Sequence, residues 1–357
     1  DLSEAPEVIV LTTFDADADI LAALAAGKHV YCQKPLTHTV REARTITEAA
    51  RRAKVQTQMG NQGHSSESIR LLKEWLAAGV IGAVREVHAW TDRPVGGDPW
   101  SNFAVQAQSK DTPPVPATLN WDLWLGPVAH RAYHPDYHPL KWRAWLDFGT
   151  GPLGDMGCHI IDPAFWALDL GAPTTVEATT THWEKDVSSQ TFPRASIVRY
   201  QFPARGARPP VALTWYDGRL QPPIPADLEP GRKLPGSGAL IIGDKGTLLH
   251  GSHGAGGLRL LPETRMKEFV RPEKTLPRVV GSHEADWLRA CKAGPGAPPP
   301  CSTFEYGGAL TETVLLGVLA MRLPNQRLTW DSANLQFANN PAADALLHTP
   351  YRDGWSL

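Results

Sequence analysis

Short apolar runs alternate with helix-favouring stretches at the start of the chain, and this pattern predicts a layered α/β domain. Residues 7–12 form a continuous apolar run with β-branched members, which is typical of a strand buried on both faces. Residues 28–32 and 55–59 predict two further short strands. Between the first two strands, residues 16–26 are rich in alanine and favour a helix that ends at Gly27.

Two amphipathic helices complete this pattern. Thr39 and Glu42 have the spacing of a capping box and predict the start of a helix. The buried face of that helix is marked by Val40, Ala43, Ile46, Ala50 and Ala53. A further helix, ending near Gly79, has its apolar face at Ile69, Leu72, Trp75 and Leu76. Helices that alternate with apolar strands predict a parallel, doubly wound sheet.

Polar segments follow each of the three predicted strands. In a doubly wound sheet, ligands bind outside the carboxyl ends of the strands. The residues at those ends are Thr12, Thr13, Gln33, Lys34, Pro35, Asn61 and Gln62. We therefore predict that these three loops converge on one ligand-binding edge.

The pattern changes in the rest of the chain. Residues 84–91 alternate like a half-buried strand, and a loop-rich stretch with many Pro, Gly, Trp and His residues follows from Arg93 to Gly154. Asp244-Lys245-Gly246 suits a hairpin turn between two of the later strands. Those later strands, predicted to form an antiparallel sheet, are 175–182, 195–202, 211–216, 239–242 and 247–250. Helices are predicted at 283–293 and 305–321.

One part of a dinucleotide-binding fold is missing from the first domain. Such folds open with a strand, a Gly-x-Gly-x-x-Gly turn and a helix that holds the pyrophosphate. No such motif precedes residues 7–12, and we interpret the glycine-rich residues 251–257 as a turn. We therefore assign residues 1–82 to the C-terminal part of a Rossmann-type domain and residues 83–357 to a second domain. The chain is expected to be truncated, or to have lost half of its cofactor domain.

Composition excludes several functional classes. The 35 Lys and Arg residues nearly balance the 37 Asp and Glu residues, so nothing indicates a nucleic acid or a membrane surface as a partner. The four cysteines form no Cys-x-x-Cys pair, and we expect reduced thiols and no metal site. The 13 tryptophans give weak support for a carbohydrate-like ligand. The compartment stays open: cytoplasmic, or periplasmic if an export signal preceded the first residue.

Several motifs, in the right order, resemble the Gfo/Idh/MocA family of oxidoreductases. Residues 26–36, Ala-Gly-Lys-His-Val-Tyr-Cys-Gln-Lys-Pro-Leu, are similar to the family's Lys-Pro signature. Trp142-Arg143 and residues 149–162 resemble its Trp-Arg motif and Asp-x-Gly-x-His block, and residues 243–247 resemble its glycine hairpin. The resemblance covers residues 7–357. Met59 to Gln62, residues 121–127 and residues 351–355 resemble a large bacterial branch whose members are often exported.

This resemblance implies a fold and an activity. The fold would be a Rossmann domain followed by an α+β domain with a large, mostly antiparallel open sheet, through which the family commonly forms dimers or tetramers. The activity would be an NAD(P)-dependent oxidation or reduction of a sugar, polyol or glycoside, with NAD or NADP as cofactor. The resemblance assigns Lys34, Asp155 and His159 to catalysis. Trp142 and Arg143 join the strand-end residues as candidates for cofactor binding, although Trp142 also suits the core and Arg143 a surface or interdomain ion pair.

The same three residues suit hydride transfer on chemical grounds. Removing a hydride from a sugar carbon needs a base for the hydroxyl proton and a cation near the developing alkoxide. Lys34 can supply the cation, and His159 suits the base because its ordinary pKa lies near neutral pH. Asp155 shares a face with His159 if the segment is helical, and would bind substrate hydroxyls or orient the imidazole. Pro163 fits the first turn of a helix better than its interior.

Two departures from the family pattern keep alternatives open. Gln33 stands where the family has glutamate, and Thr12-Thr13-Phe14 lacks the proline and histidine of the usual loop on the nicotinamide side. A variant of the family chemistry would oxidise a sugar, cleave a neighbouring glycosidic bond and reduce the product again. The second alternative is a degenerate, non-catalytic member that serves as a binding or assembly subunit.

Overall fold

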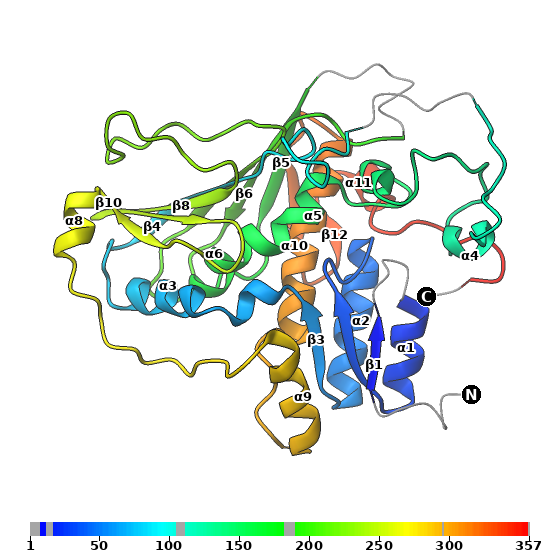
Figure 1. The fold of residues 1–357 in the computed structure, drawn as a ribbon, viewed down its shortest axis with the longest axis horizontal. Coiled ribbons are helices and arrows are strands. Elements are labelled where there is room, and N and C mark those ends of the chain that lie inside the picture. The colour runs from blue at the N-terminus through cyan, green and yellow to red at the C-terminus, as the bar shows by residue number, and fades with distance from the viewer. Residues whose placement is uncertain (1–7, 12–16, 105–110, 182–189, 295, 356–357) are drawn as a thin grey trace.

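The computed structural model describes residues 8–11, 17–104, 111–181, 190–294 and 296–355. Figure 1 shows a small N-terminal sheet beside a large sheet, with the long helix α10 (Phe304–Arg322) running between them. Nearly all of α10 is buried, from Leu310 through Met321, so this helix forms the shared core of the two halves. Within the described ranges, no helix combines the length and apolarity needed to cross a membrane.

The small sheet confirms the predicted parallel arrangement. Its strands are β1 (Val8–Leu11), β2 (His29–Gln33) and β3 (Thr57–Gly60), paired in parallel in the order β1-β2-β3. The helices of this half are α1 (Asp17–Ala25), α2 (Val40–Ala53), the 3-10 helix η1 (Gln62–Ser65) and α3 (Glu67–Ala77). Strand β2 ends one residue later than predicted, so Gln33 pairs with Gly60 inside the sheet and Lys34 is the first residue beyond it.

Helix α2 begins at the predicted capping box. The Thr39 side chain accepts a hydrogen bond from the Glu42 backbone N–H at 3.3 Å, and Glu42 Oε2 accepts from the Thr39 N–H at 2.7 Å. Glu42 Oε1 also accepts from the Tyr351 hydroxyl at 2.8 Å. The capping box thus places the start of α2 directly after the Lys34 loop and joins it to the C-terminal segment.

Replacing the capping side chain is expected to destabilise the protein modestly. The substitution Thr39→Ala removes one acceptor for the first turn of α2 and should lower the free energy of unfolding by about 1 kcal/mol. Thr45→Ala is the matched control, because among the described residues the Thr45 hydroxyl bonds only to the Arg41 carbonyl of the same helix. Urea unfolding measures both variants. An equal loss for the two would contradict a specific capping role.

The second half is built on a nine-stranded, mostly antiparallel sheet, as the sequence predicts. The strands are β4 (Val84–Trp90), β5 (Thr175–Thr180), β6 (Ser196–Phe202), β7 (Val211–Tyr216), β8 (Gly238–Gly243), β9 (Gly246–Gly251), β10 (Arg259–Leu261), β11 (Leu328–Asp331) and β12 (Gln336–Phe337). Their order is β10-β9-β8-β4-β7-β6-β5-β11-β12. Strand β4 pairs in parallel with β7 and antiparallel with β8, so residues after β4 and β7 leave the sheet at the same edge.

The remaining helices lie around the two sheets. They are α4 (Trp121–Leu125), η2 (Lys141–Ala144), α5 (Gly151–Ile160), α6 (Asp162–Ala167), α8 (Glu263–Glu268), α9 (His283–Ala293) and α11 (Pro341–Asp344). The segment that carries Asp155 and His159 is therefore helical, and the helix breaks at Ile161 so that Pro163 lies in the first turn of α6. The boundary between domains at residue 82 stays a prediction; the large sheet begins at Val84.

Candidate functional site

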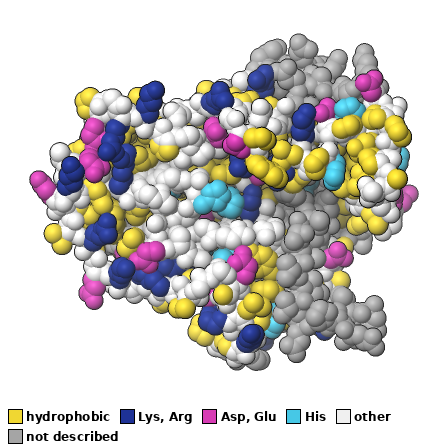
Figure 2. Space-filling view, in the orientation of Figure 1, with side chains coloured by type: hydrophobic (Ala, Val, Ile, Leu, Met, Phe, Trp, Pro, Cys, Tyr) yellow, Lys and Arg dark blue, Asp and Glu magenta, His cyan; other side chains and the backbone are white. Residues whose placement is uncertain are grey.

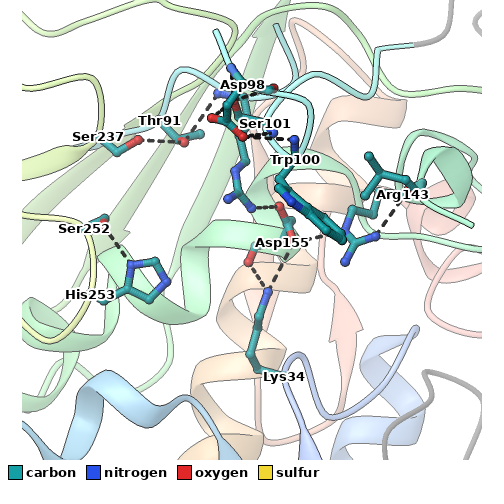
Figure 3. Close-up of polar contacts among 12 residues, drawn as sticks. Lys34, Thr91, Asp98, Trp100, Ser101, Arg143, Asp155, Ser237, Ser252 and His253 are labelled. Carbon is teal, nitrogen blue, oxygen red and sulfur yellow. Dashed lines mark hydrogen bonds and ion pairs between the residues drawn. The ribbon is translucent and has the colours of Figure 1, made fainter. Parts of the chain in front are cut away.

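Lys34 lies where the two halves of the molecule meet. Its Nζ is 3.3 Å from Asp155 Oδ1 and also donates to the Asp155 backbone carbonyl. Figure 3 shows the lysine side chain reaching from the end of its strand to the aspartate in the middle of α5. A residue from the small sheet and one from the helices on the large sheet thus form one contact, 121 positions apart in the chain.

Two glycines allow α5 to begin at this point. Gly151 has a φ of +63°, and a Cβ there would come within 2.7 Å of the Phe192 ring. A Cβ on Gly149 would lie 2.7 Å from the Cα of Arg143. Glycine is therefore needed for the tight turn and for the close approach of the Arg143 backbone. This turn places Asp155 and Arg143 next to each other.

Asp155 is surrounded by three cations. Besides Lys34, its carboxylate accepts from Arg93 NH1, and from Arg143 Nε at 3.4 Å. Burial disfavours the charged carboxylate, but the charges of Lys34, Arg93 and Arg143 outweigh that effect and hold the pKa of Asp155 well below its usual value. The carboxylate is therefore ionised at neutral pH.

His159 lies one helical turn after Asp155 and is buried, with 7% of its surface exposed. Its ring packs against that of His253 at a tilt of 36°, with centroids 4.2 Å apart. Burial, followed by the charges of Lys34 and His253, lowers the pKa of His159 well below its ordinary value. Among the described residues, nothing hydrogen-bonds its buried Nδ1. The imidazole is therefore neutral at pH 7, and Asp155 bonds to cations rather than to this ring.

His253 comes from the glycine-rich turn after β9. Gly254 packs against Gly63, and its carbonyl accepts from the Ser66 hydroxyl at 2.6 Å, so the turn is attached to the small-sheet half. Partial desolvation, then the charges of Lys34 and Arg93, lower the pKa of His253 as well. Histidine, lysine and arginine side chains share the middle of the face drawn in Figure 2. The predicted turn at 251–257 is confirmed, and it contributes a side chain to the site.

The remaining candidates differ in their placement. Thr12 and Thr13 lie outside the described residues. Gln33 packs its amide over Gly60, and Pro35 follows Lys34 through a cis peptide bond. Asn61 is buried and accepts from Ser302 at 2.6 Å.

Gln62 donates to the Tyr31 hydroxyl at 3.3 Å. In η2, the guanidinium of Arg143 stacks over the Trp142 ring at 4.4 Å. Of the predicted residues, Lys34, Arg143, Asp155 and His159 therefore gather at one place. Asn61 faces the interior, and the cofactor roles of the strand-end residues stay predictions.

A buried polar cluster holds α6 against the small-sheet half. The carboxylate of Asp162 lies 2.8 Å from His64 Nδ1 of η1 and accepts from the Tyr306 hydroxyl of α10. All three side chains are buried or partly buried. Because Asp162 follows His159 by less than one turn, this cluster fixes the end of α5 relative to the Lys34 loop.

Sequence reasoning missed Arg93 and His253. Arg93 is the first residue of the long loop, and only two residues separate it from the end of β4 at Trp90. Its position at the end of an alternating strand was the available signal. His253 is a lone histidine in a glycine-rich turn, and such a residue by itself indicates no function. Both reach the site only because β4, β8 and β9 are neighbours in the large sheet.

Comparison with protein families identifies the chain's relatives. The model of the C-terminal alpha/beta domain of the GFO_IDH_MocA oxidoreductase family matches residues 66–202. The family's NAD-binding Rossmann-fold model matches residues 4–61, and the two matches together cover more than half of the chain. The chain belongs to this family. The fold agrees: an inositol dehydrogenase homolog of Azotobacter vinelandii, crystallised with NADH and myo-inositol, aligns over 92% of this chain and 80% of its own, with a TM-score of 0.55 and 15% identity.

Other relatives extend the comparison. The WlbA dehydrogenase of Bordetella pertussis, in complex with NADH and UDP-GlcNAcA, aligns over 93% of this chain and 82% of its own, with a TM-score of 0.58 and 13% identity. Inositol 2-dehydrogenase of Serratia proteamaculans is 36% identical over 83 residues, which are 23% of this chain and 25% of that protein. Levoglucosan dehydrogenase of Pseudarthrobacter phenanthrenivorans is 23% identical over 164 residues, 46% of this chain and 32% of its own length. The chain thus spans about a quarter to a third of the curated relatives it matches.

The residues present fit one part of a dinucleotide. The carboxyl ends of β2 and β3 lie side by side in a parallel sheet, at the edge where such sheets bind nucleotides. Lys34 projects from that edge toward Asp155, so a nicotinamide ring could lie against the same polar cluster.

Proposed function

We propose that this chain is an NAD(P)-dependent oxidoreductase that acts on a hydroxyl group of a sugar, polyol or glycoside. One observation carries the proposal: Lys34, at the carboxyl end of a parallel strand, bonds to Asp155 of helix α5, and its charge acts on the neutral His159 one turn further along that helix. The family relatives support it, because they are named for inositol and levoglucosan and structural relatives carry NADH. The nicotinamide would lie at the edge of the small sheet formed by the carboxyl ends of β2 and β3.

The three residues divide the chemistry between them. Bound NAD(P)⁺ would supply the acceptor for the hydride that leaves the carbon bearing the hydroxyl group. His159, neutral because burial lowers its pKa, accepts the hydroxyl proton as the carbonyl forms. Lys34 donates a hydrogen bond to the same oxygen and stabilises the negative charge that develops on it. Asp155 holds the ammonium group in place through its carbonyl and carboxylate oxygens.

Calorimetry with NAD⁺ and NADP⁺, followed by NADH absorbance with myo-inositol, levoglucosan and D-glucose, tests the proposal. The expected result is binding of at least one nucleotide, and a keto product formed together with reduced nucleotide. A released aglycone without net reduced nucleotide would instead identify redox-assisted glycoside cleavage. If the chain binds neither nucleotide, the proposal fails for this chain and a non-catalytic binding role is favoured.

The pH dependence of the oxidation follows from the lowered pKa of His159. An ordinary histidine base loses activity below about pH 6.5. Because the pKa of His159 is lowered, we expect kcat/KM to stay constant from neutral pH through about pH 6.5 and to fall only below it. Asp155 adds no acid limb, since its carboxylate stays ionised. The measurement is kcat/KM against pH for the protein and for His159→Gln, which should lose the acid limb. A limb centred above neutral pH would exclude His159 as the base.

We also propose that the chain forms a homo-oligomer, a dimer or tetramer, through the open face of the large sheet. Alternate residues of β6 and β7 are buried against the helices, while Ile197, Arg199 and Thr214 on the other face are partly exposed. Light scattering is expected to give at least a dimer, and Ile197→Glu to yield monomers. A monomeric parent protein would contradict this assignment.

A further inference from the structure

Arg93 is held in a fixed position at the edge of the site. Its carbonyl accepts from the Gly218 N–H at 2.7 Å, and its own N–H donates to the Thr91 hydroxyl at 3.4 Å. The Thr91 hydroxyl in turn lies 3.0 Å from that of Ser237 (Figure 3). Three segments of the large-sheet half therefore fix the backbone from which this guanidinium reaches Asp155.

Most of the hydrogen-bonding capacity of Arg93 remains unused. A guanidinium has five N–H donors, and Arg93 commits an NH1 donor to Asp155 Oδ2. Within the described part of the chain, its Nε and NH2 have no hydrogen-bond partner, and the side chain is 24% exposed. The Nε and NH2 groups form one planar edge of the guanidinium. That edge matches two oxygens of a carboxylate or a phosphate in a paired, charge-assisted contact.

The charges around Arg93 leave an excess of cations. Lys34, Arg93 and Arg143 share the single carboxylate of Asp155. Asp98 also interacts with the charge of Arg93, but its carboxylate already accepts from the Ser101 hydroxyl and the Trp100 N–H. Asp92 precedes Arg93 in the chain but forms no ion pair with it in the described residues. His159 and His253 add no positive charge at neutral pH, because their pKa values are lowered.

An exposed aromatic ring lies on the loop that follows Arg93. Trp100 is 69% exposed, at the tip of a loop closed by the bridge between Val95 and Asn102. In Figure 3 its indole points toward Asp155 and Arg143. A flat apolar ring next to polar groups suits the face of a sugar. The loop that begins at Arg93 thus also carries an exposed flat ring.

From these observations we infer that the substrate is a sugar with an anionic group, a carboxylate or a phosphate, which the Nε–NH2 edge of Arg93 binds. This inference rests on the proposed function, which it makes more specific. Arg93 then determines specificity as well as holding Asp155. A role limited to holding Asp155 would leave the preference between charged and neutral sugars unchanged when the arginine edge is removed.

The test compares sugars with and without an anionic group on the same ring. D-Glucuronate and D-glucose 6-phosphate are compared with D-glucose, and D-galacturonate with D-galactose, by NADH formation and by calorimetric binding. We expect either the uronates or the sugar phosphate to exceed the corresponding neutral sugar at least tenfold in kcat/KM or affinity. Which of the two is preferred identifies the anionic group as a carboxylate or a phosphate. Arg93→Lys keeps the positive charge beside Asp155 but lacks the planar edge of the guanidinium. It should therefore reduce the ratio of charged to neutral sugar, in kcat/KM or affinity, about tenfold, even if the rates with both sugars change.

Arg51→Lys is the matched control, because Arg51 is exposed on α2 and pairs with Glu305. It should leave the ratio unchanged. Equal or better use of the neutral sugars, or a preference that survives Arg93→Lys, overturns the inference and leaves the proposed oxidoreductase activity intact. If no sugar is oxidised, the proposed function fails. The calorimetric preference still decides whether Arg93 binds an anionic sugar, and no preference there overturns the inference.

Discussion

Lys34→Met is expected to lower kcat/KM for sugar oxidation about 10³-fold, within the range found for loss of a positioned acid–base or electrostatic group. Methionine keeps the apolar stem of the side chain but removes the ammonium that would stabilise the developing alkoxide. The loss should appear mainly in kcat, since the interaction strengthens as charge develops on the oxygen. Steady-state kinetics and nucleotide binding are measured on the same preparation, so that a cofactor defect is separated from a chemical one.

Two further variants make this result specific. Lys292→Met removes an exposed ammonium from α9, away from the contact with Asp155, and is expected to leave kcat/KM unchanged. Lys34→Arg keeps the positive charge but not the shape of the ammonium group. It should not restore activity, because a planar guanidinium cannot take the place of a compact ammonium. A loss of less than tenfold in Lys34→Met would remove this residue from the proposed chemistry.

The sequence predicted the small sheet well because its signals are local. Apolar runs define β1 to β3, and the spacing of Thr39 and Glu42 defines the start of α2. Lys34 could be found in the same way, as a polar residue directly after a buried strand. The errors were shifts of one or two residues at strand ends, where flanking residues such as Gln33 suit either strand or loop. Such shifts matter here, because they decide which side chain leaves the sheet first.

The rest of the site depends on contacts that no local pattern contains. Asp155 and His159 were predicted from a motif, but not that Asp155 would bind three cations instead of the imidazole. Arg93 approaches Asp155 only because β4 runs parallel to β7, which brings its end to the same edge. His253 arrives through a hairpin two strands away. The order of strands in the large sheet, which has no reliable local signal, therefore determined what sequence reasoning missed.

Asp155→Asn is expected to reduce both stability and activity. The variant leaves Lys34, Arg93 and Arg143 close together without the carboxylate between them. Removing one partner of a buried ion pair typically costs 3–5 kcal/mol, and the partial exposure of these cations reduces the effect, so we expect a loss of about 2–3 kcal/mol at pH 7. Activity should fall about 10²-fold or more, because the ammonium of Lys34 loses its charged partner and keeps only neutral carbonyl acceptors.

The pH dependence of that loss separates electrostatics from packing. The folded-state pKa of Asp155 is lowered, so its charge stabilises the protein above the unfolded value of about 3.8, and this stabilisation disappears as pH falls toward the folded pKa. The difference in unfolding free energy between the protein and Asp155→Asn should therefore be full at pH 7 and shrink below about pH 4. Asp147→Asn is the control, because Asp147 is half exposed and pairs only with Arg131 among the described residues. It should cost less than about 1 kcal/mol. If the difference in unfolding free energy between the protein and Asp155→Asn does not change with pH, then the shape of the side chain, not its charge, holds the three cations together. The excess of positive charge assigned to this site would then lose its basis.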